Sequence, residues 1–144
     1  MSGDVIEIFL VEDNDGDVFL ARKAFEKLTR PYRITVANDG ETALRMLRKE
    51  GEYQETPHPH LIFLDINLPG KDGKRVLLDI KNDENLRRVP VIVLSSSKAE
   101  HDILQVYNDL ASAYICKPNT IDDFRNIVAA VDTFWFGHCI LPKR

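Results

Sequence analysis

The sequence contains few cysteines, and neither of them suggests a covalent or metal-bound framework. Cys116 and Cys139 are the only two among 144 residues. They lie far apart and form neither a C-x-x-C motif nor part of a set of metal ligands. We therefore expect no disulfide framework and no zinc site, and we expect two reduced thiols that are mostly packed inside the protein.

Long apolar runs and an excess of positive charge are also missing. No apolar run approaches the ~18 residues that span a bilayer, and Asp4 and Glu7 stand where a secretory signal would carry Lys or Arg. The 23 Asp and Glu residues outnumber the 19 Lys and Arg residues, for a net charge of -4, whereas duplex-binding proteins usually carry a basic stripe. These absences predict a cytoplasmic protein whose partners include neither nucleic acid nor a membrane.

The composition that remains is that of one globular domain. The chain is 44% hydrophobic and 29% charged, which is typical of a folded protein, and its length fits one domain rather than two. We expect a single domain over residues 1–144, with a core at about 5–132 and an apolar C-terminal tail at 133–144.

Short apolar runs alternate with segments of helical periodicity along the chain. We expect five strands, at residues 5–11, 33–37, 61–64, 91–94 and 113–116. Asp39, Thr120 and the capping-box residue Ser97 are expected to begin helices, and Gly51 to end one. Because the connections are too long for hairpins, the strands must run parallel with right-handed crossovers. The prediction is an α/β, doubly wound, five-stranded parallel sheet.

The longest irregular connection, residues 52–60, contains two prolines that discourage both helix and strand. His58 and His60 lie two residues apart in it, but further metal ligands are missing nearby. We therefore expect no metal site in this loop.

Polar residues follow four of the expected strands, at the edge where an open doubly wound sheet binds its ligands. The first strand leads into Glu12 and Asp13, the third into Asp65, the fourth into Ser95 and the fifth into Lys117. Three carboxylates at close range raise one another's pKa unless a cation neutralises them. Oxygen ligands suit Mg²⁺ or Mn²⁺ better than Zn²⁺. The sequence therefore predicts a site for a hard divalent cation.

The same residues suit phosphoryl chemistry. An Asp can attack phosphorus to form an acyl phosphate, while the Lys117 ammonium and the Ser95 hydroxyl can contact the phosphoryl oxygens. Each of these residues alone has an ordinary structural role as a helix cap or a solvated loop residue. Their occurrence together at four strand ends is what favours a functional site.

Four motifs in chain order resemble the receiver domains of two-component response regulators over about residues 5–132. The motifs are FLVED at 9–13, LDINLPGKDG at 64–73, PVIVLSS at 90–96 and YICKP at 114–118. The resemblance implies a flavodoxin-like receiver fold with strand order 2-1-3-4-5. It also implies a phosphoprotein that takes part in a phosphorelay.

The resemblance implies a phosphoacceptor and a metal site. Asp65 is the phosphoacceptor, and Mg²⁺ (or Mn²⁺) is held by Asp13, Asp65 and the backbone carbonyl of Asn67. Glu12 supports the metal through water. Glu12 stands where the family more often has Asp, which is a tolerated variant.

The resemblance also implies a catalytic pair and a switch. Ser95, where Thr is commoner, and Lys117 contact the phosphoryl group, while Ser95 and Tyr114 form the conformational switch. A tight turn with a cis peptide bond is implied between Lys117 and Pro118.

Two further segments resemble the small stand-alone regulators paired with phytochrome-type histidine kinases. These segments are residues 11–17, with VEDN followed by GD, and the Phe134-Trp135 tail. The narrower resemblance implies that a phosphohistidine on a sensor kinase is the phosphodonor.

Apolar residues concentrate after the last expected helix, at positions 134–136, 140 and 141. Such a cluster either packs back on its own domain or forms an interface. Because no output domain fits after residue 132, we expect the signal to leave by protein contacts, and we favour a homodimer through the tail.

The leading hypothesis is a stand-alone response regulator that accepts a phosphoryl group on Asp65 and catalyses its own phosphorylation and dephosphorylation, rather than an enzyme. The alternative is a Mg²⁺-dependent phosphohydrolase with an aspartyl-phosphate intermediate, but Asn67 stands where such enzymes have a general acid. A flavodoxin-like cofactor binder is disfavoured because the acidic loop would repel a free phosphate. An interaction module with a vestigial pocket is disfavoured by the complete acidic set with Lys117.

Overall fold

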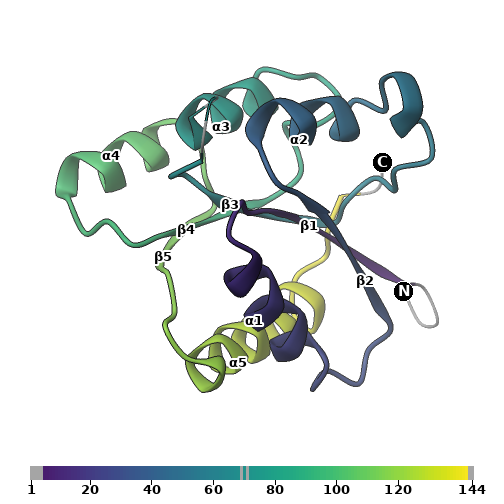
Figure 1. Ribbon diagram of the computed structural model, residues 1–144. Helices are drawn as coiled ribbons and strands as arrows, with labels where there is room; N and C mark the ends of the chain where they lie inside the picture. The colour runs from purple at the N-terminus through teal and green to yellow at the C-terminus, as the bar shows by residue number, and fades with distance from the viewer. Residues whose placement is uncertain (1–4, 69, 71, 143–144) are drawn as a thin grey trace.

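The computed structural model describes residues 5–68, 70 and 72–142, and it contains a five-stranded parallel sheet (Figure 1). The strands are β1 (Ile6–Val11), β2 (Tyr32–Ala37), β3 (Leu61–Asp65), β4 (Val91–Ser95) and β5 (Ala113–Cys116). Their order in the sheet is β2-β1-β3-β4-β5, and every neighbouring pair is parallel. The predicted fold class and strand order are therefore confirmed.

Helices cover both faces of this sheet. They are α1 (Asp15–Phe25), α2 (Gly40–Leu47), α3 (Gly73–Lys81), α4 (Glu100–Asn108) and α5 (Ile121–Val131), with a short 3-10 helix η1 (Gly51–Tyr53) and a π-helical turn η2 (Asp132–Phe136). Figure 1 shows α1 and α5 on one face and α2, α3 and α4 on the other. Among the described residues, none of the helices combines the length and the apolar character needed to cross a membrane.

Side chains that alternate along each strand pack into two hydrophobic cores, one on each face of the sheet. Phe9 and Val11 of β1 pack in the core beneath α2 and α3, whereas Ile8 and Leu10 pack in the core beneath α1 and α5. Successive side chains of a strand point to opposite faces. With helices on both faces, both sets are buried, which explains why β3, β4 and the second half of β1 appear in the sequence as continuous apolar runs.

The predicted helix caps are confirmed at two positions and wrong at a third. Asp39 accepts a hydrogen bond from Thr42 N at 2.8 Å, and Thr120 accepts one from Asp123 N at 3.1 Å. Helix α4, in contrast, begins at Glu100 with Ala99 as its cap, two residues later than Ser97 would place it. The Ser97 hydroxyl instead donates to a carboxylate inside the first turn of α4.

Helix α2 ends at Leu47, before the predicted stop at Gly51, and the end is a Schellman motif. Glu50 N donates to Arg45 O at 2.9 Å, and Lys49 N donates to Met46 O at 3.0 Å. Lys49 has a φ of 58° in this motif, which is the left-handed conformation usually taken by Gly. Gly51 adopts the same conformation two residues later, at the start of η1.

Replacing Lys49 by Gly should stabilise the protein. A left-handed conformation costs a non-Gly residue about 1–2 kcal/mol, and part of the gain is offset because Gly is more flexible in the unfolded chain. We expect Lys49→Gly to raise the free energy of unfolding by about 0.5–1 kcal/mol, measured by urea denaturation. Glu50→Gly is the control, because Glu50 is extended, with φ -80°, and should lose stability. Equal losses in the two variants would contradict the prediction.

The C-terminal tail divides into packed and exposed residues. Trp135 and Phe136 of η2 pack against the core beneath α1 and α5, whereas Phe134 is 54% and Ile140 is 99% exposed. An ion pair between Arg30 and Asp132, at 2.7 Å, joins the loop after α1 to the start of the tail. Part of the tail therefore packs on its own domain, as one of the two expectations held, and the homodimer stays a prediction.

The two thiols are free, but only one has the predicted packed environment. Cys139 is half-buried, whereas Cys116 is exposed. Cys116 is the last residue of β5, and β5 is an edge strand with a neighbour on one side only. The expectation that both cysteines are mostly packed was therefore wrong for Cys116.

Candidate functional site

The structure brings the predicted strand-end residues together at the carboxyl edge of the sheet. Glu12, Asp65 and Ser95 are almost completely buried, and Asp13 is exposed. Glu12, Asp13 and Asp65 each place a carboxylate oxygen within 4.8 Å of the other two. The parallel register is the cause, because it sets Asp65 beside Leu94 and so ends β1, β3 and β4 at the same level.

Lys117 lies among three carboxylates. Its Nζ is 2.7 Å from Glu12 Oε1, 2.7 Å from Asp17 Oδ2 and 3.0 Å from Asp65 Oδ2. Burial by itself would lower the pKa of Lys117, but hydrogen bonds to Asp17, Glu12 and Asp65 outweigh burial and raise it above its usual range. The side chain therefore keeps a positive charge that can pair with an anionic oxygen.

Asp17 is a site residue that the sequence analysis did not assign. It lies in the first turn of α1, where its backbone N donates to Asn14 Oδ1 at 3.0 Å. From this position the Asp17 carboxylate reaches Lys117. No signal in the local sequence marked it as a partner of Lys117.

The site carries more negative than positive charge. The carboxylates of residues 12, 13, 17 and 65 face one ammonium, that of Lys117. Burial and the nearby charge of Asp65 raise the pKa of Glu12 to about 7, although its hydrogen bond with Lys117 acts in the opposite direction. Crowded, partly buried carboxylate oxygens of this kind fit a hard divalent cation, as the sequence analysis predicted.

The loop after β3 is held tightly against the site. Asn67 N donates to Asp65 Oδ1 at 2.9 Å, and Gly73 N donates to Ile66 O at 3.2 Å. A side chain at Gly73 would collide with the backbone of Asp65 and Ile66, so α3 approaches this loop closely only because Gly is there. Two further residues of the 64–73 motif, at positions 69 and 71, lie outside the described residues.

The remaining features predicted near the site are Ser95, Tyr114 and the turn at Pro118. Ser95 Oγ accepts a hydrogen bond from Ser97 N at 3.1 Å, and the half-buried Tyr114 donates its hydroxyl proton to Ser97 O at 2.8 Å. The prediction of a cis peptide bond before Pro118 was wrong, since the bond is trans. The trans isomer is the intrinsically favoured one, and Lys117 reaches the carboxylates with it.

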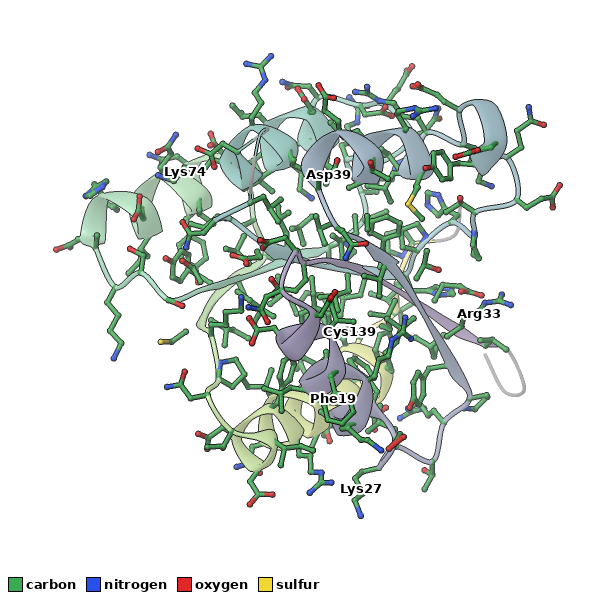
Figure 2. The ribbon with its side chains drawn as sticks, viewed as in Figure 1. Phe19, Lys27, Arg33, Asp39, Lys74 and Cys139 are labelled. Carbon is green, nitrogen blue, oxygen red and sulfur yellow. The ribbon has the colours of Figure 1, made fainter. Side chains whose placement is uncertain are left out.

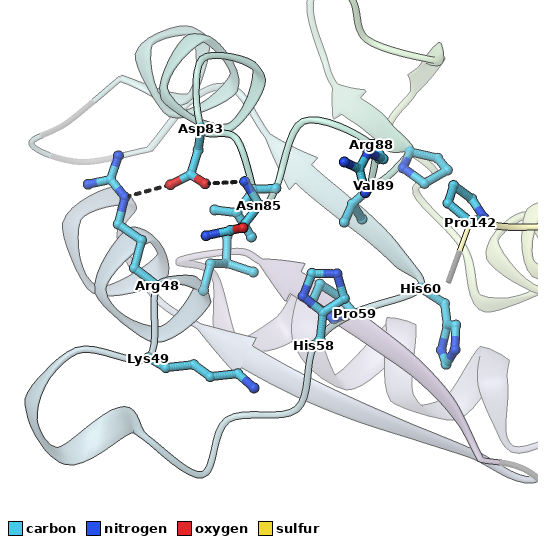
Figure 3. Close-up of a pocket in the computed structure, with 13 residues that line it drawn as sticks. Arg48, Lys49, His58, Pro59, His60, Asp83, Asn85, Arg88, Val89 and Pro142 are labelled. Atoms are coloured by element: carbon cyan, nitrogen blue, oxygen red, sulfur yellow. Dashed lines mark hydrogen bonds and ion pairs between the residues drawn. The ribbon is translucent and has the colours of Figure 1, made fainter. Parts of the chain in front are cut away.

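A cavity of about 350 Å³ lies away from this site, between the end of α2 and the loops that precede β3 and β4 (Figure 3). Its wall includes His58, His60 and the ion pair of Arg48 with Asp83 at 3.3 Å. His60 Nδ1 accepts a hydrogen bond from Glu7 N at 2.9 Å, so this nitrogen has a structural role. Among the described residues, no group of three potential metal ligands includes either histidine.

The strand order and the residues at the carboxyl edge of the sheet define a receiver domain of two-component signalling. The sequence matches the response regulator receiver domain family over residues 8–129, and the protein belongs to this family. Receiver domains of this kind are signalling modules rather than conventional enzymes, which supports the leading hypothesis over the phosphohydrolase.

Two response regulators are similar over nearly the whole chain. Response regulator Rcp1 of Synechocystis sp. strain PCC 6803 is 36% identical over 135 residues, which cover 94% of this chain and 92% of Rcp1. The crystal structure of the phosphorylated cyanobacterial phytochrome response regulator RcpA superposes with a TM-score of 0.92. The two sequences are 41% identical, and the match covers 97% of this chain and 100% of the RcpA chain. The narrower resemblance made from sequence is therefore confirmed.

A metal-bound relative has also been solved. The structure of the Mn²⁺-bound form of Rcp1 superposes with a TM-score of 0.88 at 36% identity, covering 96% of this chain and 99% of that chain. That relative binds a divalent cation, and the acidic group of this chain has the donor atoms that such a cation takes.

Proposed function

We propose that this protein accepts a phosphoryl group on Asp65 from a phosphohistidine of a sensor histidine kinase. The observation that carries the proposal is the setting of the Asp65 carboxylate. It is almost completely buried, yet it lies 3.0 Å from the Lys117 ammonium and close to the carboxylates of Glu12 and Asp13. A nucleophile, a cation for the phosphoryl oxygens and a set of metal ligands are thus gathered at one point.

The transfer needs positioning and charge neutralisation more than covalent help. A carboxylate oxygen of Asp65 attacks phosphorus, the phosphorus–nitrogen bond of the phosphohistidine breaks, and the imidazole leaves with the electron pair. Lys117 pairs with one phosphoryl oxygen, and the Ser95 hydroxyl donates to another. Attack of water on the same phosphorus later returns Asp65 to its free carboxylate.

The metal would be held by the carboxylates of Asp13 and Asp65 and by the backbone carbonyl of Asn67. Glu12 would contribute through water, since its Oε1 is already engaged by Lys117 at 2.7 Å. Bound Mg²⁺, or Mn²⁺ in its place, neutralises charge on the transferring phosphoryl group. The excess of carboxylates over ammonium groups in the site supports this assignment.

Incubation of the full chain with a small phosphodonor and Mg²⁺ tests the proposal. Intact mass should show a gain of one phosphoryl group per chain, and the gain should decay after the donor is removed. A pure interaction module would gain no mass. A phosphohydrolase would release phosphate continuously from a phosphomonoester without accumulating the modified protein.

Ser95 and Tyr114 are proposed to form the switch. Ser95 and Tyr114 lie on the neighbouring strands β4 and β5, and both hydrogen-bond to Ser97. We expect phosphorylation to draw Ser95 toward the phosphoryl group and to change the rotamer and burial of the Tyr114 ring. Aromatic NMR spectra with and without beryllofluoride, a phosphoryl mimic, measure this change, and identical Tyr114 signals would contradict it.

The proposed phosphodonor is a phytochrome-type histidine kinase. Its support is the similarity to the phytochrome response regulator RcpA over nearly the whole chain. A cytoplasmic location also stays a prediction of the sequence analysis.

We also propose that residues 1–144 form one domain, with a core at about 5–132, and that the tail at 133–144 mediates homodimerisation. The packing of Trp135 and Phe136 on the core supports the single domain. The exposed side chains of Phe134 and Ile140 offer apolar surface to a second copy.

The double variant Phe134→Glu with Ile140→Glu tests the dimer. Truncation after residue 132 would remove packed residues as well, whereas these two positions are exposed, so the double variant should leave the fold intact. We expect a dimer for the wild type at tens of micromolar and a monomer for the variant, measured by light scattering. A monomeric wild type, with and without beryllofluoride, would contradict the proposal.

A further inference from the structure

The cavity at the amino ends of β3 and β4 is assembled from four segments that are distant in the sequence. They are the end of α2, the loop before β3, the segment between α3 and β4, and the last described residue of the tail, Pro142. The volume of about 350 Å³ lies in the range of small-molecule sites. Asp65 ends β3 at the opposite, carboxyl edge of the sheet, so the cavity is separate from the proposed phosphorylation site.

The charged side chains around the cavity give it an excess of positive charge, although the whole chain has a net charge of -4. Arg48 and Asp83 balance each other as an ion pair at 3.3 Å. Lys49 and Arg88 also line the cavity, and no acidic side chain among the described residues pairs with either of them. The cavity therefore offers two cationic groups to an anion.

Lys49 occupies a backbone position that its residue type disfavours. Its φ is 58°, and Gly is the usual residue at this point of a Schellman motif. Figure 3 shows the half-buried Lys49 side chain extended toward His58. Residues held in disfavoured conformations are concentrated at functional sites. A cationic side chain in the cavity accounts for Lys here, whereas Gly would serve better if ending α2 were the only role.

The segment that carries Arg88 is fixed by a second lysine. Lys81 Nζ donates to the carbonyl oxygens of Arg87 and Val89, at 3.0 Å and 2.9 Å, on either side of Arg88. The side chains of Leu86 and Val89 are buried in the core beneath α2 and α3. The backbone is thus held in place before a ligand arrives, which lowers the entropic cost of binding.

Apolar and ring side chains form much of the remaining wall. A bare inorganic anion would contact only the cationic groups, whereas a larger organic anion would also remove this apolar surface from water. The side chains concerned are those of Leu47, His58, Pro59, Leu86, Val89 and Pro142.

We propose that this cavity binds a small phosphorylated molecule, with Lys49 and Arg88 contacting the phosphate and the apolar wall contacting the organic part. A phosphate monoester carries about two negative charges at neutral pH, which matches the two cationic groups. Lys49 offers an ammonium group to the phosphate oxygens, and the Arg88 guanidinium can bind two of them at once. The inference uses none of the phosphoryl-transfer residues and does not depend on the proposed function.

NMR titration of the full chain without Mg²⁺ tests the proposal, with adenosine monophosphate, inorganic phosphate and adenosine as probes. In the absence of a metal, the carboxylates of residues 12, 13, 17 and 65 repel free phosphate from the other edge of the sheet. We expect adenosine monophosphate to shift the amide signals of the cavity residues saturably. Inorganic phosphate, which lacks the apolar contacts, and adenosine, which lacks the charge, should each bind about tenfold more weakly.

Two variants remove one cation each from the cavity. Lys49→Met and Arg88→Gln should each weaken the binding of adenosine monophosphate by about tenfold. Lys49→Gly should lose the same affinity while it gains the stability expected from relief of the left-handed conformation. Binding and stability therefore change in opposite directions in this variant, so a loss of affinity cannot be attributed to unfolding.

Lys27→Gln is the matched control, because it changes the net charge by the same amount as Arg88→Gln. Lys27 is exposed, and Figure 2 shows it beyond the end of α1, on the side of the sheet opposite α2. We expect this variant to bind adenosine monophosphate with wild-type affinity. Equal weakening by Lys27→Gln and Arg88→Gln would show that net charge, rather than the cavity, attracts the anion, and would overturn the proposal.

Three other results would also overturn it. One is an absence of saturable shifts at the cavity, and another is an affinity that Lys49→Met and Arg88→Gln leave unchanged. The third is equal binding of adenosine and adenosine monophosphate, since the cationic groups would then have no role. An affinity for inorganic phosphate equal to that for adenosine monophosphate would overturn the organic part of the proposal and leave free phosphate as the ligand.

Discussion

Asp65→Asn should gain no phosphoryl group when the full chain is incubated with a small phosphodonor and Mg²⁺. An amide is a poor nucleophile and lacks the negative charge that a metal ligand supplies here, so we expect the rate of modification to fall by roughly a thousandfold or more. Intact mass measures the result. The substitution keeps the shape of the side chain and relieves repulsion with Glu12, whose pKa the Asp65 charge raises, so the variant should remain folded.

Asp13→Ala is the companion variant for this test. Asp13 is exposed, unlike Asp65, and its carboxylate belongs to the acidic group without contacting Lys117 in the described structure. We expect phosphorylation to be restored by raising the Mg²⁺ concentration, because this variant loses a metal ligand and keeps the nucleophile. Persistence of the full mass gain in Asp65→Asn would contradict the assignment of the phosphoacceptor.

Gly73→Ala should destabilise the protein by about 3 kcal/mol, which is the upper part of the usual range for overpacking. A Cβ at this position would lie 2.5 Å from the Asp65 carbonyl oxygen and closer still to the Ile66 Cα. Both neighbours are backbone atoms of a loop that follows a buried strand, so neither can move aside as a flexible side chain would. Urea denaturation measures the loss.

The same variant should also weaken phosphorylation, because relief of the collision requires α3 to move away from the Asp65 loop. Gly16→Ala is the control, since its nearest neighbour is a side-chain atom, Asn14 Oδ1, at 3.1 Å. Ala is the better helix former by about 1 kcal/mol, which offsets the tight contact, so we expect a small change in stability. Equal stability of Gly73→Ala and the wild type would show that α3 approaches the loop less closely than described.

The sheet could be predicted from the sequence because its signal is local. In β3 and β4 all five residues are buried, so each strand appears as an uninterrupted apolar run that a polar residue ends. The lengths of the connections then required parallel strands. The end of α2 was harder to predict, since Lys49 takes a conformation that its residue type disfavours, and nothing in the local sequence marks it.

The strand-end residues could likewise be predicted, because parallel strands bring their carboxyl ends to one edge whatever the details of packing. Asp17 could not be assigned in the same way. Its carboxylate reaches Lys117 only because of how α1 is rotated about its axis. Rotation of a helix about its axis depends on packing against the sheet and its neighbours, which the spacing of polar residues does not reveal.

The role of Ser97 was also predicted wrongly from the local sequence. Its sequence context, with Glu100 three residues later, is typical of a capping box, yet its hydroxyl bonds to Asp102, which Lys74 also engages from α3. The sequence by itself determined the sheet, the strand-end chemistry and the family, since these depend on hydrophobic pattern and residue order along the chain. The tertiary structure alone decided that Asp17 pairs with Lys117 and that Lys74 pairs with Asp102, because the position of each helix is set by packing between segments distant in the sequence.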